Sequence, residues 1–152
     1  MSMKLLCDQM LGSLATWLRI LGYDTAYVKE GDDGEIVARA RGEGRVLLTR
    51  DKELAASYEP SLLLESTHVR EQLESVLREL HLSVDWDRVL SRCTVCNRSV
   101  EAVDKEAVRD EVPPRAYQEH EQFWRCPSCG RVYWTGTHWD NMRRFIASLR
   151  AG

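Results

Sequence analysis

The sequence has no long hydrophobic run, since no apolar stretch approaches the roughly 18 residues that a membrane-spanning helix needs. Its beginning, MSMKLLCDQM, also lacks the extended apolar core of a secretory signal peptide. Hydrophobic residues make up 43% and charged residues 30% of the 152 residues, an ordinary balance for a globular protein. We therefore expect a cytoplasmic protein with no membrane partner.

The motifs that mark several common α/β enzymes are also missing. The sequence contains no GxGxxG, no GxxxxGKS or GxxxxGKT, and no GxSxG. These absences argue against a dinucleotide-binding enzyme, a P-loop NTPase and an α/β-hydrolase. A phospho-receiver or phosphatase is a weaker alternative, because no acidic pair follows the first predicted strand and no lysine follows a late one.

What the sequence does have is a regular alternation of strand-like and helix-like patterns over its first ninety residues. Short apolar runs predict strands over residues 3–7, 25–28, 45–49 and 61–65. Apolar residues at helical spacing predict helices over residues 9–22, 32–44, 52–57 and 68–80. Strands that are apolar on both faces and alternate with helices predict a parallel sheet covered by helices.

The pattern changes near residues 86–92. Residues 1–90 carry more acidic than basic side chains, whereas residues 91–152 are slightly basic and richer in aromatic residues. The overall net charge of -3 argues against a protein that binds nucleic acid through bulk charge alone, but it leaves room for a local basic patch. We expect one domain over residues 1–88 and a smaller one over residues 89–152.

Polar residues follow three of the predicted strands, and the carboxyl ends of parallel strands share one edge of a sheet. These residues are Asp8 after the first strand, Asp32, Asp33 and Glu35 after the second, and Thr49, Arg50 and Asp51 after the third. Gathered carboxylates repel each other unless a cation lies among them, and hard oxygen ligands suit Mg²⁺ or Mn²⁺. Such an ion activates water for a phosphoryl displacement. Asp24 belongs at the opposite edge, where we interpret it as a turn residue.

A structural explanation stands beside this one. Asp8 and Asp51 each precede a predicted helix, and Asp32 with Glu35 forms a capping-box pattern. Capping explains each acid singly, and the two roles are compatible, because an acid at a helix start can face the same edge of the sheet. The convergence of three strand ends favours a metal site.

Two CxxC pairs, Cys93 with Cys96 and Cys126 with Cys129, supply four thiols for one tetrahedral ion. Structural zinc is the prediction, since redox motifs of the thioredoxin type occur singly. The segment between the pairs, residues 97–125, is longer than is usual and must hold an insertion. The fifth cysteine, Cys7, lies on the first strand, where a small buried hydrophobe is expected.

Basic and aromatic residues surround the cysteines, a composition that suits binding of single-stranded nucleic acid through phosphates and base stacking. The candidate contacts are Arg92, Arg98, Arg125, Arg131 and Trp134, with Arg19 on the first helix and His138 near the last one. The alternative is that the aromatic residues only cover a small core. A final helix is predicted after a capping box from Thr137 to Asp140, and its apolar face must pack on another element.

Together these pieces resemble the PIN-like ribonuclease domain of the Mut-seven C-terminal type, a PIN-like domain fused to a zinc ribbon. The resemblance covers nearly the whole chain and rests on four segments in order: CDQMLGSLATWLRILGYD (7–24), DDGEIVARARGEGRVLLTRDKEL (32–54), the paired CTVC and CPSC, and VYWTGTHWDNM (132–142).

The resemblance implies a three-layer α/β/α sandwich with a parallel sheet, followed by a zinc ribbon and a C-terminal helix. It also implies cleavage of RNA that depends on Mg²⁺ or Mn²⁺, with the acidic positions of the family on Asp8, Asp33 and Asp51. Asp32 and Glu35 are substitutes on the second helix, Thr49 and Arg50 are supporting residues, and Glu65 is the candidate for the fourth acid of PIN nucleases. The alternative is a non-catalytic RNA-binding or scaffold module on the same fold.

Overall fold

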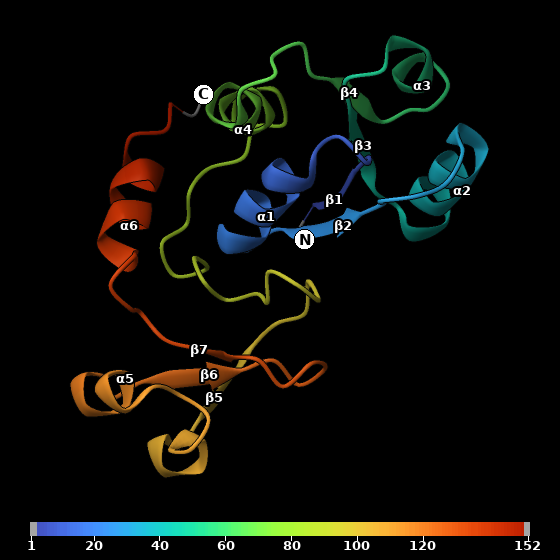
Figure 1. Cartoon of the computed structure of the whole chain (residues 1–152). Coiled ribbons are helices and arrows are strands. Elements are labelled where there is room, and N and C mark those ends of the chain that lie inside the picture. Colours follow the sequence, from blue (N-terminus) through green and yellow to red (C-terminus); the bar gives the residue numbers. More distant parts are fainter. Residues whose placement is uncertain (1–2, 151–152) are drawn as a thin grey trace.

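The structure, a computed structural model, describes residues 3–150. Its first half is built on a four-stranded parallel sheet in the order β2-β1-β3-β4 (Figure 1). The strands are β1 (Lys4–Cys7), β2 (Asp24–Tyr27), β3 (Val46–Thr49) and β4 (Ser61–Leu63). This confirms the predicted α/β class and the parallel arrangement.

Helices cover both faces of this sheet, because successive residues of the central strands point to opposite sides. Leu5 and Leu48 pack with α1 (Gly12–Ile20) and α4 (Val69–Glu79) on one face. Leu6 and Leu47 pack with α2 (Asp33–Glu43) and α3 (Lys52–Ala56) on the other face. All four leucines are fully buried. The first half is therefore the expected three-layer α/β/α sandwich.

The second half contains a small antiparallel sheet, which we call the cysteine ribbon (residues 91–134). Its strands are β5 (Glu101–Val103), β6 (Phe123–Arg125) and β7 (Val132–Tyr133), in that order across the sheet. The insertion between the two CxxC pairs also forms the short 3-10 helix η1 (Lys105–Val108) and α5 (Pro114–Glu119). Val108, Val112, Ala116 and Phe123 make a separate core here.

The last helix, α6 (Trp139–Ala147), packs on the first half of the chain. Ile146 is 1% exposed in the core that α1 and α4 share, and the Phe145 and Trp17 ring centroids are 4.5 Å apart. The apolar face of the predicted helix therefore has its partner, and that partner is α1 rather than the ribbon. The division into residues 1–88 and 89–152 stays a prediction.

Two predicted helix starts are wrong in detail. Helix α1 begins at Gly12 after an N-cap Leu11 that makes no side-chain cap, so Asp8 does not cap it. Helix α6 has its N-cap at His138, again without a capping side chain, so the Thr137–Asp140 capping box does not form. In both places a turn precedes the helix, so the helix begins later than expected and the expected capping residue, Asp8 or Thr137, is not its N-cap. No helix within residues 3–150 has the length and apolar character to cross a membrane.

Candidate functional site at the carboxyl edge of the sheet

Asp8, Asp33 and Asp51 line one cavity of about 200 Å³ at the carboxyl edge of the parallel sheet. Asp8 follows β1, Asp51 follows β3, and Asp33 is the first residue of α2. The same cavity is lined by Gln9, Met10, Ile36, Arg50 and Leu54. The three acids expected at this edge are therefore brought together by the topology of the sheet.

Asp8 is held in place by Thr49. The Asp8 side chain is nearly buried, with 7% of the residue exposed, and the fully buried Thr49 hydroxyl donates a hydrogen bond to its Oδ2 atom. The amide of Met10 donates to Oδ1 over a longer distance of 3.4 Å. Because a buried polar group is costly without hydrogen bonds, Thr49 holds the Asp8 side chain in this position.

Asp51 is the N-cap of α3, and it also lines the cavity. Its Oδ1 atom accepts hydrogen bonds from the amides of Glu53 and Leu54 at 2.9 and 3.2 Å. Its own amide donates to the Thr49 Oγ1 atom at 3.0 Å, so Thr49 connects the two carboxylates. The capping role and the position at the cavity are both real, as the sequence allowed.

The other residues expected to support the site are distributed differently. Asp32 caps α2 by accepting from the Glu35 amide at 2.8 Å, and neither residue lines the acidic cavity. Glu65 lies in a separate cavity beside α4. Arg50 does line the acidic cavity, and its buried Nε atom has no hydrogen-bond partner within the described chain.

The four cysteines of the two CxxC pairs converge in the ribbon. Their sulfur atoms all lie within 4.8 Å of one another, and those of Cys93 and Cys129 are 3.8 Å apart. A tetrahedral zinc ion with Zn–S bonds of about 2.3 Å sets neighbouring sulfurs about 3.8 Å apart. The group fits zinc. Across residues 3–150 it is the one group of three or more His, Cys, Asp or Glu side chains close enough to hold a metal ion. The carboxylates of Asp8, Asp33 and Asp51 therefore lie farther apart than those sulfur atoms.

The two cysteine pairs have matching local geometry, which the sequences CTVCNR and CPSCGR explain. Cys93 donates its amide proton to the Arg98 carbonyl, and Cys126 does the same to the Arg131 carbonyl, at 2.8 and 2.9 Å. The residues after each pair, Asn97 and Gly130, both have positive φ, 65° and 78°. Asn tolerates this conformation better than most residues, so it replaces the usual glycine.

The electrostatics of the cluster favour a bound cation. Burial acts to raise the pKa of the Cys93 thiol, but hydrogen bonds from the Tyr133 hydroxyl and nearby amides outweigh it and lower this pKa to about 6. The contact with Cys129 raises the pKa of Cys96 to about 11. The pKa values of Cys93 and Cys96 are thus shifted in opposite directions without metal, and a divalent ion favours the thiolate form of both.

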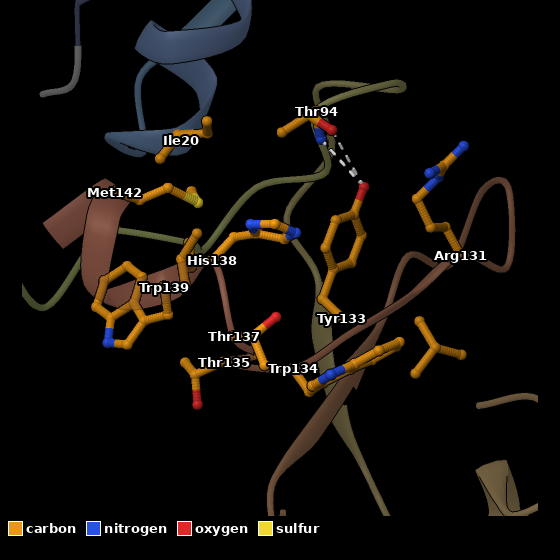
Figure 2. A pocket seen from close by; sticks show the side chains of 13 residues that line it. Ile20, Thr94, Arg131, Tyr133, Trp134, Thr135, Thr137, His138, Trp139 and Met142 are labelled. Carbon is orange, nitrogen blue, oxygen red and sulfur yellow. Dashed lines mark hydrogen bonds between the residues drawn. The ribbon is translucent and has the colours of Figure 1, made fainter. Parts of the chain in front are cut away.

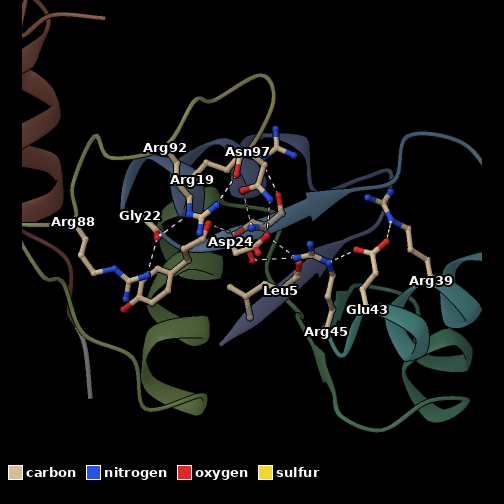
Figure 3. Close-up of polar contacts among 12 residues, drawn as sticks. Leu5, Arg19, Gly22, Asp24, Arg39, Glu43, Arg45, Arg88, Arg92 and Asn97 are labelled. Atoms are coloured by element: carbon tan, nitrogen blue, oxygen red, sulfur yellow. Dashed lines mark hydrogen bonds and ion pairs between the residues drawn. The ribbon is translucent and has the colours of Figure 1, made fainter. Parts of the chain in front are cut away.

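A polar junction fastens the first cysteine pair to the amino edge of the parallel sheet (Figure 3). The Asn97 side chain donates to Asp24 Oδ1 at 2.6 Å and accepts from the Thr25 amide at 2.9 Å. Arg45 also binds Asp24 Oδ1, at 2.8 Å. Asp24 is therefore the ion-paired first residue of β2 and not a turn residue, although it lies at the edge that we expected.

This junction was missed from the sequence, as Asp24, Arg45 and Asn97 belong to no recognisable motif. The equivalence of Asn97 and Gly130 after the two cysteine pairs was the available signal. Burial opposes ionisation of Asp24, but the hydrogen bonds from Arg45 and Asn97 outweigh it and hold the pKa of this carboxyl below its usual range.

Three of the arginines expected to contact nucleic acid have hydrogen bonds or ion pairs within the protein, and their contact with nucleic acid stays a prediction. Arg19 donates to the carbonyls of Thr25 and Thr94, both at 2.8 Å. Arg92 donates to the carbonyls of Gly22 and Asn97. Arg125 forms an ion pair with Glu111. These side chains join segments distant in the sequence.

The remaining candidates for nucleic-acid contact lie on the cysteine ribbon and at the start of α6. Arg98, Arg131 and His138 are exposed, while Trp134 is half-buried. Arg131, Trp134 and His138 line a second cavity of about 400 Å³ between β7, α6 and the end of α1 (Figure 2). Arg98 does not line it.

Comparison with known proteins agrees with this architecture. The sequence model of the Mut7-C RNAse domain matches residues 3–146. The human protein named exonuclease mut-7 homolog is 34% identical over 101 residues, which are 62% of this chain and 12% of the human protein. No solved structure matches the chain significantly. The family match runs from β1 through both cysteine pairs into α6, and it supports a nuclease-type function. The chain therefore belongs to the Mut7-C RNAse domain family.

Proposed function

We propose that this protein cleaves RNA phosphodiester bonds in a reaction that depends on Mg²⁺ or Mn²⁺. The observation that carries the proposal is the convergence of Asp8, Asp33 and Asp51, from three separate chain segments, on one cavity. Carboxylate oxygens are the ligands that these ions prefer. When bound, the ion activates water and stabilises the oxygens of an in-line displacement at phosphorus.

The three acids differ in how firmly they are held. Asp8 and Asp51 are fixed through Thr49 and the first turn of α3. Asp33 is exposed on the first turn of α2 and keeps its rotamer freedom. Because the carboxylates stand apart, we propose that Asp33 approaches the other two when the ion and the RNA bind.

Arg50 supplies the positive charge at this cavity. Its buried Nε atom has no partner within residues 3–150, and an unsatisfied buried donor is costly. We propose that the Arg50 guanidinium binds a phosphate oxygen of the RNA, since arginine binds phosphate with a planar pair of donors.

The ribbon serves in two ways in this proposal. A zinc ion bound by the four cysteines stabilises the fold, and exposed Arg98, Arg131 and His138 with Trp134 contact the RNA strand. The description of the family as an RNAse domain supports RNA as substrate, and the human relative is named as an exonuclease.

The test is cleavage of end-labelled single-stranded RNA in Mn²⁺ or Mg²⁺, with Asp51→Asn as the variant. Asparagine is as good an N-cap as aspartate, so α3 stays capped while one metal-ligating charge is lost. Glu53→Gln is the matched control, because Glu53 is exposed on the same helix and does not line the cavity. We expect Asp51→Asn to lower the rate at least about a hundredfold and Glu53→Gln to leave it unchanged.

A non-catalytic RNA-binding module is the competing function, and one observation favours it. Glu65 lies outside the acidic cavity, so the described chain places three acids there and no fourth. If folded protein binds RNA but leaves it intact in Mn²⁺ and in Mg²⁺, the binding module is the correct function and the ribonuclease proposal is wrong.

A further inference from the structure

The cavity of about 400 Å³ beside the ribbon lies at the opposite end of α1 from the acidic cavity. Ile20, the last residue of α1, lines it together with Leu90, while Gln9 and Met10, just before α1, line the acidic cavity. Its volume falls at the lower end of the range for pockets that bind small organic ligands. A nucleoside is of suitable size.

Most of the aromatic rings that line this cavity belong to no apolar core. Tyr133, His138 and Trp139 line it, and none of them is a member of the core clusters found within the described residues. Figure 2 shows the His138 imidazole between the Tyr133 ring and the α6 residues Met142 and Trp139. Trp134 differs, since it also packs on Phe123 of the ribbon core with ring centroids 6.1 Å apart. Rings that no core requires are available to stack on a ligand.

The polar groups at the cavity suit a ligand that carries negative charge and hydrogen-bonding edges. Arg131 is exposed and makes no side-chain hydrogen bond or ion pair within residues 3–150. The His138 side chain occupies the N-cap position of α6 but makes no capping hydrogen bond. Thr135 and Thr137 add hydroxyl groups to the lining. A flat ring with a phosphate attached matches this combination.

We propose that this cavity binds one nucleobase of the RNA strand, stacked on Trp139 and His138, with its phosphate near Arg131. The inference rests on the proposed function for the identity of the strand. Base stacking on aromatic side chains tolerates any base, so the site anchors the strand without reading its sequence.

The position of the base-binding cavity also sets a minimum length for the RNA substrate. Helix α1, whose two ends lie next to the two cavities, has 9 residues and is about 13 Å long at 1.5 Å per residue. A stacked strand rises about 3.4 Å per nucleotide, so about four nucleotides span this distance. Only an RNA of at least that length occupies both cavities at once, and the anchor sets a minimum substrate length.

The first test measures binding without cleavage. Fluorescence anisotropy of a labelled U8 oligonucleotide is compared between Asp51→Asn protein and the same protein with Trp139→Ala or His138→Ala added. We expect each addition to weaken binding roughly tenfold, the usual effect of removing one stacking ring. Arg144→Ala is the control, since Arg144 is exposed on α6 outside the cavity, and it should change binding by no more than about twofold.

Binding of a base is separated from binding of phosphate by NMR. The tryptophan indole N–H signals are recorded with adenosine 5′-monophosphate and with ribose 5-phosphate. We expect the Trp139 signal to shift with the nucleotide and not with the sugar phosphate. Equal shifts with both compounds, or unchanged U8 binding in Trp139→Ala protein whose spectrum shows a native fold, would overturn the proposal.

These outcomes do not depend on catalysis. Loss of binding in Trp139→Ala supports the base site even if no RNA is ever cleaved, in which case only the ribonuclease proposal fails. Where cleavage occurs, Trp139→Ala should raise KM for U8 about tenfold and leave cleavage of the dinucleotide UpU unchanged, because UpU is too short to reach both cavities.

Discussion

Asn97 and Asp24, which are 73 residues apart in the sequence, are joined by a hydrogen bond of 2.6 Å between Asn97 Nδ2 and Asp24 Oδ1. Asp24 also pairs with Arg45, whose side chain is 10% exposed. This contact holds the first cysteine pair against the amino edge of the parallel sheet, whereas the acids lie at the carboxyl edge. The first cysteine pair and the three acids therefore lie at opposite edges of the parallel sheet.

Replacing Asp24 by asparagine should weaken this junction. The Asp24→Asn change removes one of the two carboxylates that pair with the buried Arg45, the other being Glu43. We expect the free energy of unfolding at pH 7 to fall by about 2 kcal/mol. Glu79→Gln breaks the Arg78–Glu79 pair, whose side chains are more than half exposed, and should cost less than about 0.5 kcal/mol. Urea denaturation of both variants checks the comparison. Equal effects would show that the Asp24 pair is not special.

The same pair predicts a pH dependence. The pKa of Asp24 is depressed in the folded protein, because Arg45 and Asn97 outweigh the effect of burial, and it is about 3.9 in the unfolded chain. Its contribution to stability is therefore complete above about pH 5 and is lost as the pH falls below about 4 towards the folded pKa. The stability difference between wild type and Asp24→Asn should shrink over that interval in denaturation curves at pH 7, 5, 4 and 3. A constant difference would contradict the assignment.

Thr49 should matter more than a neighbouring buried threonine. The Thr49 hydroxyl donates to the Asp8 carboxylate, whereas the Thr25 hydroxyl donates to the neutral Tyr23 carbonyl, and both residues are fully buried. We expect Thr49→Val to lower the free energy of unfolding by about 2 kcal/mol and Thr25→Val by about 1 kcal/mol, since hydrogen bonds to charged groups are stronger. Denaturation of the two variants measures this order. The reverse order would show that Thr49 does not hold Asp8.

Zinc should be lost with any cysteine of the cluster but not with Cys7. Cys126→Ser removes one of the four ligands, and we expect loss of zinc and unfolding of the ribbon, because little else stabilises its small core. Cys7 is fully buried in the other core, where burial raises the pKa of its thiol, so Cys7→Ala should retain the metal. Metal content by mass spectrometry, with circular dichroism, tests this. Zinc retained by Cys126→Ser would rule out the four-cysteine site.

Gly22 should be intolerant of substitution, for a reason that Gly44 does not share. Both residues have positive φ, but a Cβ atom at Gly22 would lie 2.5 Å from the Arg88 carbonyl oxygen, while a Cβ atom at Gly44 would meet nothing within 4 Å. Gly44→Ala should cost about 1 kcal/mol, the backbone penalty alone. Gly22→Ala should cost clearly more, because the segment after residue 84 must move away from α1. Thermal unfolding of the pair gives the comparison.

Much of the fold could be read from local patterns in the sequence. Each predicted strand and helix of the first half appears within a few residues of its expected position, because alternation and helical spacing report burial directly. The boundaries erred where a turn intervened, as before Gly12 and before Trp139. The acids could be placed because each follows a parallel strand, and the cysteines because their spacing is a property of the chain itself.

The sequence by itself determined the order of the helices and strands, the edge of the parallel sheet that carries Asp8, Asp33 and Asp51, and the grouping of the four cysteines of the two CxxC motifs. The tertiary structure alone decided which arginines are bound, since the side chains of Arg19 and Arg92 donate to carbonyls of distant segments, whereas that of Arg131 has no hydrogen-bond partner among residues 3–150. It also decided that α6 packs on α1 and thereby completes the aromatic cavity beside the ribbon. Local patterns record whether a side chain is buried, but its partner depends on how distant segments pack, and that information exists only in the folded chain.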